Sequence, residues 1–334
     1  MVAGSSLIGM SSVASSAMVE IRNAVRAQLS DCSPGDVLIV ACSGGADSLA
    51  LAYALSKEAR KLALKVVAVT IDHQLQPNSR VQAEAVLAQC ASMGIESAEI
   101  IPVRVDITDG MEASARRARY AALDEASHRY SAAKVFLGHT QNDQAESVLL
   151  GLARGSGTRS LSGMAPVMGK YVRPLLGITR EQSVAACVDA KLTPWQDPHN
   201  LDRQYLRVRV RLDALPVLEA TIGPGVSAAL ARSAALLRDD ADALDEWATG
   251  EFHGVDPQSL EISTLQALPR AIRSRLLRAA IYACGAPQGS ITADHVNVVE
   301  SLVTSWHGQG EASLPGGVKA RRISGRLSLL APIK

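Results

Sequence analysis

The sequence has few aromatic side chains, and its apolar runs are short. Phe, Trp and Tyr together make up 3% of the 334 residues. The richest apolar runs, 37–42 and 66–71, end within about six residues, whereas a membrane-spanning helix needs about 20. Hydrophobic residues make up 47% and charged residues 20%, which is typical of a folded globular protein. Membrane-spanning and disordered chains are therefore excluded, and the length predicts two domains.

Cysteine is scarce and scattered. The five cysteines are odd in number and form no C-x-x-C pair; they are Cys32, Cys42, Cys90, Cys187 and Cys284. This pattern excludes a disulfide framework, a zinc knuckle and a thioredoxin-type pair. We therefore expect a reducing, cytoplasmic compartment.

The chain also lacks a secretory signal. Residues 1–17 are small and Ser-rich, without a basic start or a long apolar core, so we predict a disordered leader there. Met18 is an alternative start. We predict one domain over 18–215, and a helical region with a small C-terminal unit over 216–334.

Short apolar runs alternate with longer amphipathic segments in the first domain. The predicted strands are 37–41, 66–71, 99–105 and 135–138, and the predicted helices are 48–62, 79–93, 112–129 and 142–154. This alternation predicts an α/β fold with a parallel sheet covered on both faces. Beyond it, the pattern predicts helices over 180–190, 226–248, 269–284 and 292–306 and a β-hairpin over 312–330, an α+β unit.

A glycine turn follows the first predicted strand, with the sequence S-G-G-A-D-S at 43–48. Two glycines let the backbone approach a phosphate, and the helix that follows offers free N–H groups. Asp47 is compatible with phosphate only through a cation, so Mg²⁺ is implied. The Walker A and dinucleotide-binding spacings are absent. A tight turn without a ligand is the alternative.

The S-G-G-A-D-S turn resembles the PP-loop of the ATP pyrophosphatase superfamily, whose members split ATP into AMP and pyrophosphate. Further segments resemble the motifs of tRNA(Ile)-lysidine synthetases. They are I-D-H-Q-L at 71–75, E-x-x-A-R-x-x-R-Y at 112–120, 137–164, R-P-L-L at 173–176 and 197–218. The resemblance runs from about 37 to 218. The sequence departs from the family pattern at Asn142, Ser147, His199 and Val208.

This resemblance implies functional residues. The implied ATP-binding residues are Ser43, Gly44, Gly45, Ala46, Asp47, Ser48, Arg116 and His139. The implied catalytic residues are Asp47, Arg116, Asp143 and Glu146, with Asp47 and Asp143 as metal ligands. Asn142 replaces an aspartate of the family, which leaves the division between base and metal ligand open.

The spacing of these side chains is compatible with such roles. Glu112, Arg116 and Arg119 share one helix face, and guanidinium groups bind phosphate bidentately. A solvated ion-pair face is the alternative. Asp143 and Glu146 lie one helical turn apart beyond the fourth strand, where a carboxylate can accept a proton from lysine or bind a metal. His139 could instead cap that helix.

Basic residues gather in two short stretches. Net charge is +1, so a nucleic-acid partner requires local patches of positive charge. Arg203, Arg207, Arg209 and Arg211 form one patch, and Lys319, Arg321, Arg322 and Arg326 form the other. We predict that the first patch binds tRNA phosphates. Solvated surface is the alternative for both.

The function implied by the resemblance is ligation of free L-lysine to C2 of the wobble cytidine in the CAU anticodon of tRNA(Ile). ATP and Mg²⁺ would be required, and a homodimer is allowed. Three alternatives remain: a tRNA thiolase, which would usually carry a catalytic cysteine pair; an amide-forming synthetase, for which a glutaminase domain is lacking; and a nucleotide-binding module without chemistry.

Overall fold

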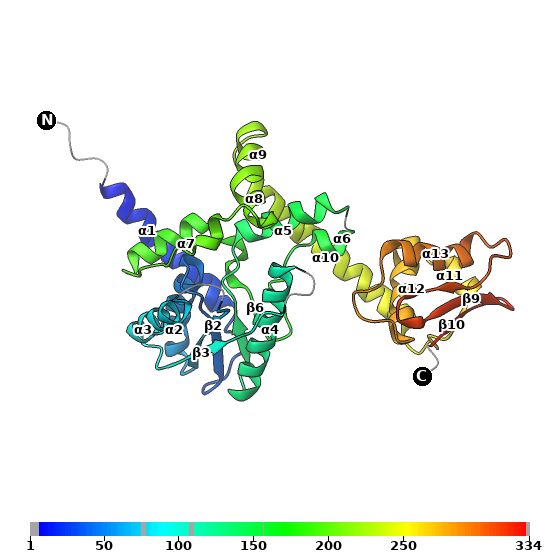
Figure 1. Ribbon diagram of the computed structural model, residues 1–334, viewed down its shortest axis with the longest axis horizontal. Coiled ribbons are helices and arrows are strands. Elements are labelled where there is room, and N and C mark those ends of the chain that lie inside the picture. The colour runs from blue at the N-terminus through cyan, green and yellow to red at the C-terminus, as the bar shows by residue number, and fades with distance from the viewer. Residues whose placement is uncertain (1–6, 75–77, 107–109, 156, 332–334) are drawn as a thin grey trace. The chain divides into compact units, whose positions relative to one another are not determined.

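The computed structural model describes residues 7–74, 78–106, 110–155 and 157–331, with side chains from Ala17 onward (Figure 1). The chain forms two compact units, Met1–Arg238 and Asp239–Lys334. Their division falls inside the continuous helix α10 (Val226–Phe252).

Helix α1 (Leu7–Ala27) begins inside the segment that we expected to be a disordered leader. Residues 7–17 are helical, and residues 1–6 lie outside the described residues. The second half of α1 is anchored, because Ile21 and Val25 are fully buried and Glu58 accepts hydrogen bonds from Arg22 and Arg26. Once one helical turn is fixed, adding further residues to the helix costs little free energy, which explains why α1 extends into residues 7–17.

Unit 1 contains a six-stranded sheet in the order β3-β2-β1-β4-β6-β5. The strands are β1 (Val37–Ala41), β2 (Lys65–Asp72), β3 (Ser97–Pro102), β4 (Lys134–Phe136), β5 (Val167–Met168) and β6 (Tyr171–Val172). All neighbouring pairs are parallel except β5 and β6, a short hairpin that the sequence pattern did not predict. The predicted parallel α/β sheet is confirmed.

Helices cover both faces of this sheet, as the alternation within its strands requires. Leu38 and Val40 of β1 pack into one core with α1, α2 and α7, whereas Ile39 packs into a second core with α4. The helices are α2 (Ala46–Lys61), α3 (Ser79–Ser92), α4 (Met111–Arg129), α5 (Gln141–Ala153), α6 (Thr158–Leu161) and α7 (Arg180–Asp189), with a 3-10 turn η1 at Pro174–Gly177.

The order of the strands positions the functional site. Strands β1 and β4 are neighbours, but the chain continues from β1 to β2 on one side and from β4 to β6 on the other, so the connections that leave their carboxyl ends run in opposite directions along the sheet. Open α/β sheets bind ligands at such a point. Gly138 after β4 lies against α2, because a Cβ at this position would lie 3.1 Å from the backbone carbon of Asp47.

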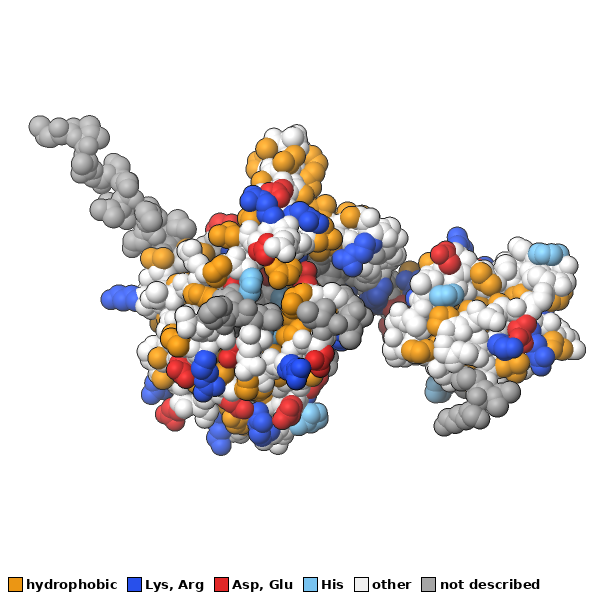
Figure 2. Space-filling model, viewed as in Figure 1, with side chains coloured by type: hydrophobic (Ala, Val, Ile, Leu, Met, Phe, Trp, Pro, Cys, Tyr) orange, Lys and Arg blue, Asp and Glu red, His pale blue; other side chains and the backbone are white. Residues whose placement is uncertain are grey.

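A helical segment follows α7 and leads to α10. It consists of η2 (Pro198–Leu201), α8 (Leu206–Arg209), the single π-helical turn η3 (Val210–Ala214) and α9 (Leu215–Thr221). On the face in Figure 2, hydrophobic side chains gather over α9, where Val217 and Ile222 are exposed. Lys and Arg side chains on that face lie among acidic ones and form no single basic field.

Unit 2 is a small α+β unit, as predicted. A four-stranded antiparallel sheet has the order β7-β10-β9-β8. Its elements are β7 (Ser259–Glu261), α11 (Ile262–Ala267), α12 (Arg270–Ala283), α13 (Ala293–Thr304), β8 (Ala312–Ser313), η4 (Pro315–Gly317), β9 (Lys319–Ile323) and β10 (Arg326–Leu330). The hairpin β9-β10 is confirmed, whereas β7 and α11 were not predicted. Leu260, Leu277 and Val299 lie in its apolar core.

Across the described ranges, no single helix is long and apolar enough to cross a membrane. One bent pair, Leu206–Thr221 with Val226–Phe252, meets the length and composition that a span needs.

Candidate active site

The turn between β1 and α2 is shaped for an anion. Gly44 has a φ of +85°, and a Cβ there would lie 2.5 Å from Val86 Cγ2, so only glycine fits without rearrangement. Helix α2 begins after Gly45 without a side-chain cap. Its first N–H groups are therefore free of a capping side chain and can bind an anion.

Ser48 holds this turn in shape. Its hydroxyl accepts a hydrogen bond from the Ser43 backbone N–H at 3.2 Å and donates one to the Gly45 carbonyl at 2.9 Å. The Ser43 and Ser48 hydroxyl oxygens lie 3.3 Å apart. Ser48 is buried, whereas Ser43 lies open to solvent. Of these two serines, both predicted to bind ATP, Ser43 is therefore the accessible one, and Ser48 organises the loop.

Asp47 points into a crowded and largely buried space. Its Oδ1 atom is buried and has no hydrogen-bond partner within the described parts of the chain. Arg180 Nη1 lies 3.9 Å from the other carboxylate oxygen. Burial raises the pKa of Asp47 to about 6, the nearby Asp143 adds to the rise, and Ser183 and Arg180 oppose it. An unpaired buried carboxylate oxygen is the group that a cation would stabilise.

The described residues contain no cluster of three or more His, Cys, Asp or Glu side chains that could hold a metal ion. Mg²⁺ commonly binds through one or two carboxylates together with phosphate oxygens. The free oxygen of Asp47, beside an anion-binding turn, fits a Mg²⁺ bound in that manner.

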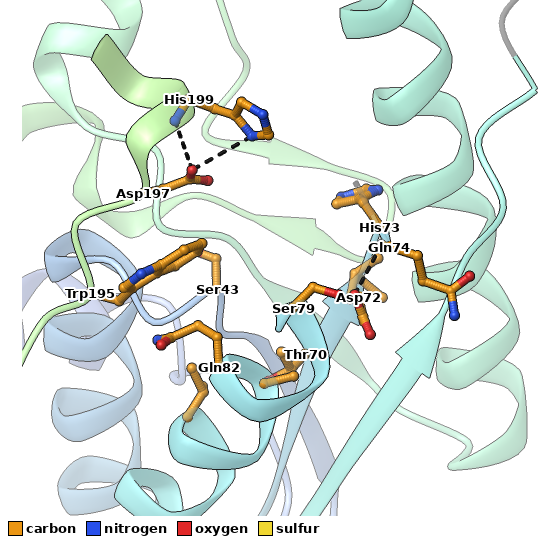
Figure 3. Close-up of a pocket in the computed structure, with 13 residues that line it drawn as sticks. Ser43, Thr70, Asp72, His73, Gln74, Ser79, Gln82, Trp195, Asp197 and His199 are labelled. Carbon is orange, nitrogen blue, oxygen red and sulfur yellow. Dashed lines mark hydrogen bonds and ion pairs between the residues drawn. The ribbon is translucent and has the colours of Figure 1, made fainter. Parts of the chain in front are cut away.

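A pocket of about 120 Å³ opens beside the glycine turn (Figure 3). Its lining comes from the turn, the end of β2, α3 and the segment 195–199: Ser43, Thr70, Ile71, Asp72, His73, Gln74, Ser79, Gln82, Ala83, Val86, Trp195, Asp197 and His199. We call it the nucleotide pocket. Apolar groups provide part of the wall, and Ser43 links the pocket to the anion-binding turn.

The segment that carries Trp195 is fastened to the glycine turn and to α3. The Trp195 backbone N–H donates to the Gly44 carbonyl at 2.8 Å. The Gln89 side chain exchanges two hydrogen bonds of 3.0 Å with the backbone of Thr193. These contacts hold Trp195 as a wall of the nucleotide pocket.

A second pocket, of about 310 Å³, adjoins the first, because His73 lines both. We call it the arginine pocket. Its other lining residues are Glu112, Ala115, Arg116, Arg119, His139, Asp143 and Arg207. The predicted site residues Arg116, His139 and Asp143 thus come together here, although they lie on different elements.

One tyrosine orders the arginines of α4. The Tyr120 ring lies 4.8 Å from the Arg116 guanidinium carbon and 5.7 Å from that of Arg119. Its hydroxyl accepts a 3.0 Å hydrogen bond from Arg173, which is buried. Burial opposes ionisation, yet the hydrogen bond from Arg173 and the surrounding arginines lower the pKa of Tyr120.

Several polar atoms in the arginine pocket are buried without a partner in the described part of the chain. They include Arg119 Nε and the Nδ1 atoms of His73 and His139. Burial, assisted by the neighbouring arginines, lowers the pKa of His139 to about 3, so this imidazole is neutral at pH 7. Burial lowers the pKa of His73 as well. The pocket therefore offers cationic groups and neutral imidazoles to an anionic, hydrogen-bonding ligand.

Asp143 and Glu146 are tied to two arginines of the following segment. Glu146 is 0% exposed, and its oxygens accept hydrogen bonds of 2.6 Å from Arg207 Nε and 2.6 Å from Arg211 Nε. Arg207 also lies 3.2 Å from Asp143 Oδ1. The other Asp143 oxygen accepts from the Thr140 backbone and hydroxyl, so Asp143, and not His139, forms the capping box of α5.

These contacts divide the four predicted tRNA-binding arginines. Arg207 and Arg211 are about one-fifth exposed and point inward to carboxylates. Arg203 is 64% exposed and pairs with Asp213, and the exposed Arg209 donates to the Arg203 carbonyl. The four residues therefore do not form one solvent-facing basic surface, because Arg207 and Arg211 lie one helical turn apart and share the face that points to Glu146.

Comparison with known proteins identifies the family of this chain. Residues 17–218 match a PP-loop domain model, and residues 260–328 match a TilS substrate-binding domain model. A tRNA(Ile)-lysidine synthase of Thermobifida fusca is 49% identical over 93% of this chain and 97% of its own. One of Streptomyces coelicolor is 52% identical over 87% of this chain and 84% of its own. The chain belongs to the tRNA(Ile)-lysidine synthase family.

A solved structure shares the fold of this lysidine synthase family member. The U34-tRNA thiolase NcsA of Methanococcus maripaludis, with its [4Fe-4S] cluster, aligns with a TM-score of 0.56 over 66% of this chain and 79% of its own. At 20% identity, this likeness concerns the fold alone. In the present chain Cys42, Cys90 and Cys187 are buried, and burial raises the pKa of Cys187 to about 12.

The residues that depart from the family pattern of lysidine synthases occupy defined places in the structure. Asn142 Oδ1 accepts a 2.9 Å hydrogen bond from the Arg180 backbone and thereby joins the starts of α5 and α7. Ser147 donates to the Asp143 carbonyl, and Val208 is buried. His199 lines the nucleotide pocket beside Asp197 (Figure 3).

Sequence reasoning did not single out Thr70, Tyr120, Arg173 or Trp195 as site residues. Thr70 carried a local signal, since it is the polar residue in the apolar run V-V-A-V-T-I at 66–71. Arg173 and Tyr120 lie in the motifs at 173–176 and 112–120, which gave them no individual role. Trp195 gave no signal, because its neighbours in the site come from distant parts of the chain.

Proposed function

We propose that this protein ligates L-lysine to C2 of the wobble cytidine in the CAU anticodon of tRNA(Ile). ATP would adenylate the C2 oxygen with loss of pyrophosphate, and the lysine ε-amine would then attack C2 and displace AMP. The main support is that the nucleotide pocket and the arginine pocket meet at His73. In addition, the chain aligns with lysidine synthases over most of its length.

In this proposal the glycine turn and the start of α2 bind the phosphates of ATP. Ser43, Gly44, Gly45 and Ala46 supply donors and space, and Ser48 keeps the turn in shape. Asp47 would hold Mg²⁺ together with phosphate oxygens, and the ion would neutralise phosphate charge. The base of ATP would lie in the nucleotide pocket.

The arginine pocket would hold the reacting groups. Arg116 and Arg119 lie where they can neutralise charge that develops on the α-phosphate, and such preorganised donors lower the barrier of phosphoryl and adenylyl transfer. His139 would accept or donate a hydrogen bond as a neutral imidazole. Asp143 lines this pocket, and although burial opposes it, Arg207 holds the pKa of Asp143 below its usual range.

That lowered pKa makes Asp143 a poor base but a stable negative charge. We assign it the task of attracting and orienting the lysine ammonium before a proton is lost. Glu146 is enclosed by Arg207 and Arg211 and does not line the arginine pocket. Its proposed task is to position these arginines, and not to take a proton.

The decisive experiment supplies the protein with ATP, Mg²⁺, labelled lysine and tRNA(Ile) with a CAU anticodon. We expect AMP, pyrophosphate and labelled RNA in equal amounts, and lysidine by mass spectrometry. A transcript with uridine at the wobble position is the control and should take up no label.

The same assay separates lysine ligation from thiolation. Sulfur transfer needs a reactive thiolate, whereas the cysteines near the site are buried. A variant with all five cysteines replaced by Ser or Ala should keep lysine-dependent AMP formation if it folds. Thionucleoside formed from a sulfide donor, or a folded but inactive cysteine-free variant, would favour the thiolase.

For tRNA binding, we propose that the exposed Arg203 and Arg209 contact phosphates. Replacing both by Ala should weaken tRNA binding and reduce the slope of log affinity against log salt by roughly 0.7 to 0.9 per contact. ATP affinity should not change. The exposed Arg80 on α3, replaced by Ala, is the matched control. An unchanged salt slope would identify Arg203 and Arg209 as plain surface residues.

Two further proposals concern the setting of the reaction. Five free cysteines and a tRNA substrate support a cytoplasmic location. A homodimer remains a proposal, which sedimentation of the full chain would test.

A further inference from the structure

The inner wall of the nucleotide pocket carries a hydroxyl that the fold does not use. Thr70 lies near the end of β2 and is 4% exposed. Its Oγ1 atom has no hydrogen-bond partner among the residues that the structure describes. A buried hydroxyl without a partner is unfavourable, and valine would fill a similar space without that cost.

Strand alternation directs this hydroxyl into the pocket. Val69 and Ile71 pack into the core on the α4 side of the sheet, whereas Ala68 packs into the core with α2 and α3. Thr70 therefore points to the side of α3, where Ala83 and Val86 line the same pocket (Figure 3).

The pocket has the features of a purine site. Ala83, Val86 and Trp195 supply apolar walls, and Ser43 connects the pocket with the anion-binding turn. With the phosphates at that turn, the base enters with its ribose-bearing side toward Ser43. The edge of adenine that carries the 6-amino group and N1 then lies deepest, next to the buried Thr70.

We propose that the Thr70 hydroxyl oxygen accepts a hydrogen bond from the 6-amino group of the adenine of ATP and thereby strengthens binding of the base. The inference rests on the proposed use of ATP and extends it to contact with the base. Thr70 is then a base-binding residue outside the glycine turn and the arginine pocket.

The test measures equilibrium binding of ATP to the full chain by calorimetry, without tRNA or lysine. Thr70→Val should raise the Kd for ATP about 5- to 10-fold, the loss expected for one hydrogen bond, and Thr70→Ser should restore most of it. Without ATP, Thr70→Val should unfold at a temperature at or above that of the wild type, because it removes a buried hydroxyl that has no partner in the described structure. Thr264→Val, at an exposed threonine that lines neither the nucleotide pocket nor the arginine pocket, is the control and should bind ATP normally.

A ligand change identifies the contacted atoms. Purine riboside triphosphate lacks the 6-amino group, so wild type and Thr70→Val should bind it equally. If Thr70→Val weakens the binding of both ligands equally, or does not weaken the binding of ATP, the inference is wrong. ATP binding by the wild type would in that case still support the proposed use of ATP. Failure of the wild type to bind ATP at all would overturn both the inference and the proposed function.

Discussion

Asp47→Asn is expected to abolish tRNA-dependent pyrophosphate release, with a loss of two orders of magnitude or more in turnover. The carboxylate has a buried oxygen without a partner in the described structure and lies at the start of α2. An amide cannot stabilise a cation there, so charge on the transferring phosphates would stay uncompensated. Release of AMP and pyrophosphate measures the effect.

The same substitution should leave the fold intact or make it more stable. Burial raises the pKa of Asp47 to about 6, which means that the fold disfavours the charged form at pH 7. Removing this charge should raise the free energy of unfolding by about 2 kcal/mol. Asp189→Asn, at an exposed position on α7, is the control and should alter neither property. Loss of stability together with activity would instead assign Asp47 a structural role, and normal turnover would exclude it from the reaction.

Glu146→Gln is expected to lower the free energy of unfolding by about 3 kcal/mol. The substitution keeps the size of the side chain but leaves Arg207 and Arg211 without their buried counter-charge. Breaking a buried ion pair on one side typically costs about 3 to 5 kcal/mol, and Asp143 compensates part of that cost here. Denaturant unfolding measures the change.

Glu181→Ala provides the comparison, because Glu181 lines the same pocket of about 620 Å³ as Glu146 but is exposed. It should leave stability unchanged. If Glu146 takes the proton from lysine, Glu146→Gln will be as stable as the wild type and will lose turnover only. That outcome would restore the catalytic role that its position one turn after Asp143 first indicated.

Much of unit 1 could be predicted because its signals are local. The run V-L-I-V-A, the glycines that follow it and the opening of α2 depend on neighbouring residues, so the predicted strand and anion-binding turn agree with β1 and α2. The helices over 112–129 and 142–154 agree with α4 and α5 within one residue at each end. The hairpin of β5 and β6 was missed because its strands are too short to show alternation.

The contacts of the site residues depend on segments that are distant in sequence. Spacing alone placed Asp143 and Glu146 together as candidates for chemistry, and it treated Arg207 and Arg211 as surface cations. The fold brings these four side chains into one buried cluster, because α8 and η3 pack against α5. A helix with many charges looks the same in sequence whether its partners are water or another helix.

Strand periodicity, glycine conformation and motif spacing are properties of short segments, so the sequence alone predicts the α/β class, the glycine turn at 43–48 and the likeness to lysidine synthases. Which polar groups remain for a ligand depends on the folded structure. Among the residues that the structure describes, one oxygen of Asp47 and the hydroxyl of Thr70 have no partner, whereas both oxygens of Glu146 accept hydrogen bonds. Burial and pairing depend on which segments pack together, and no short stretch of sequence contains that information.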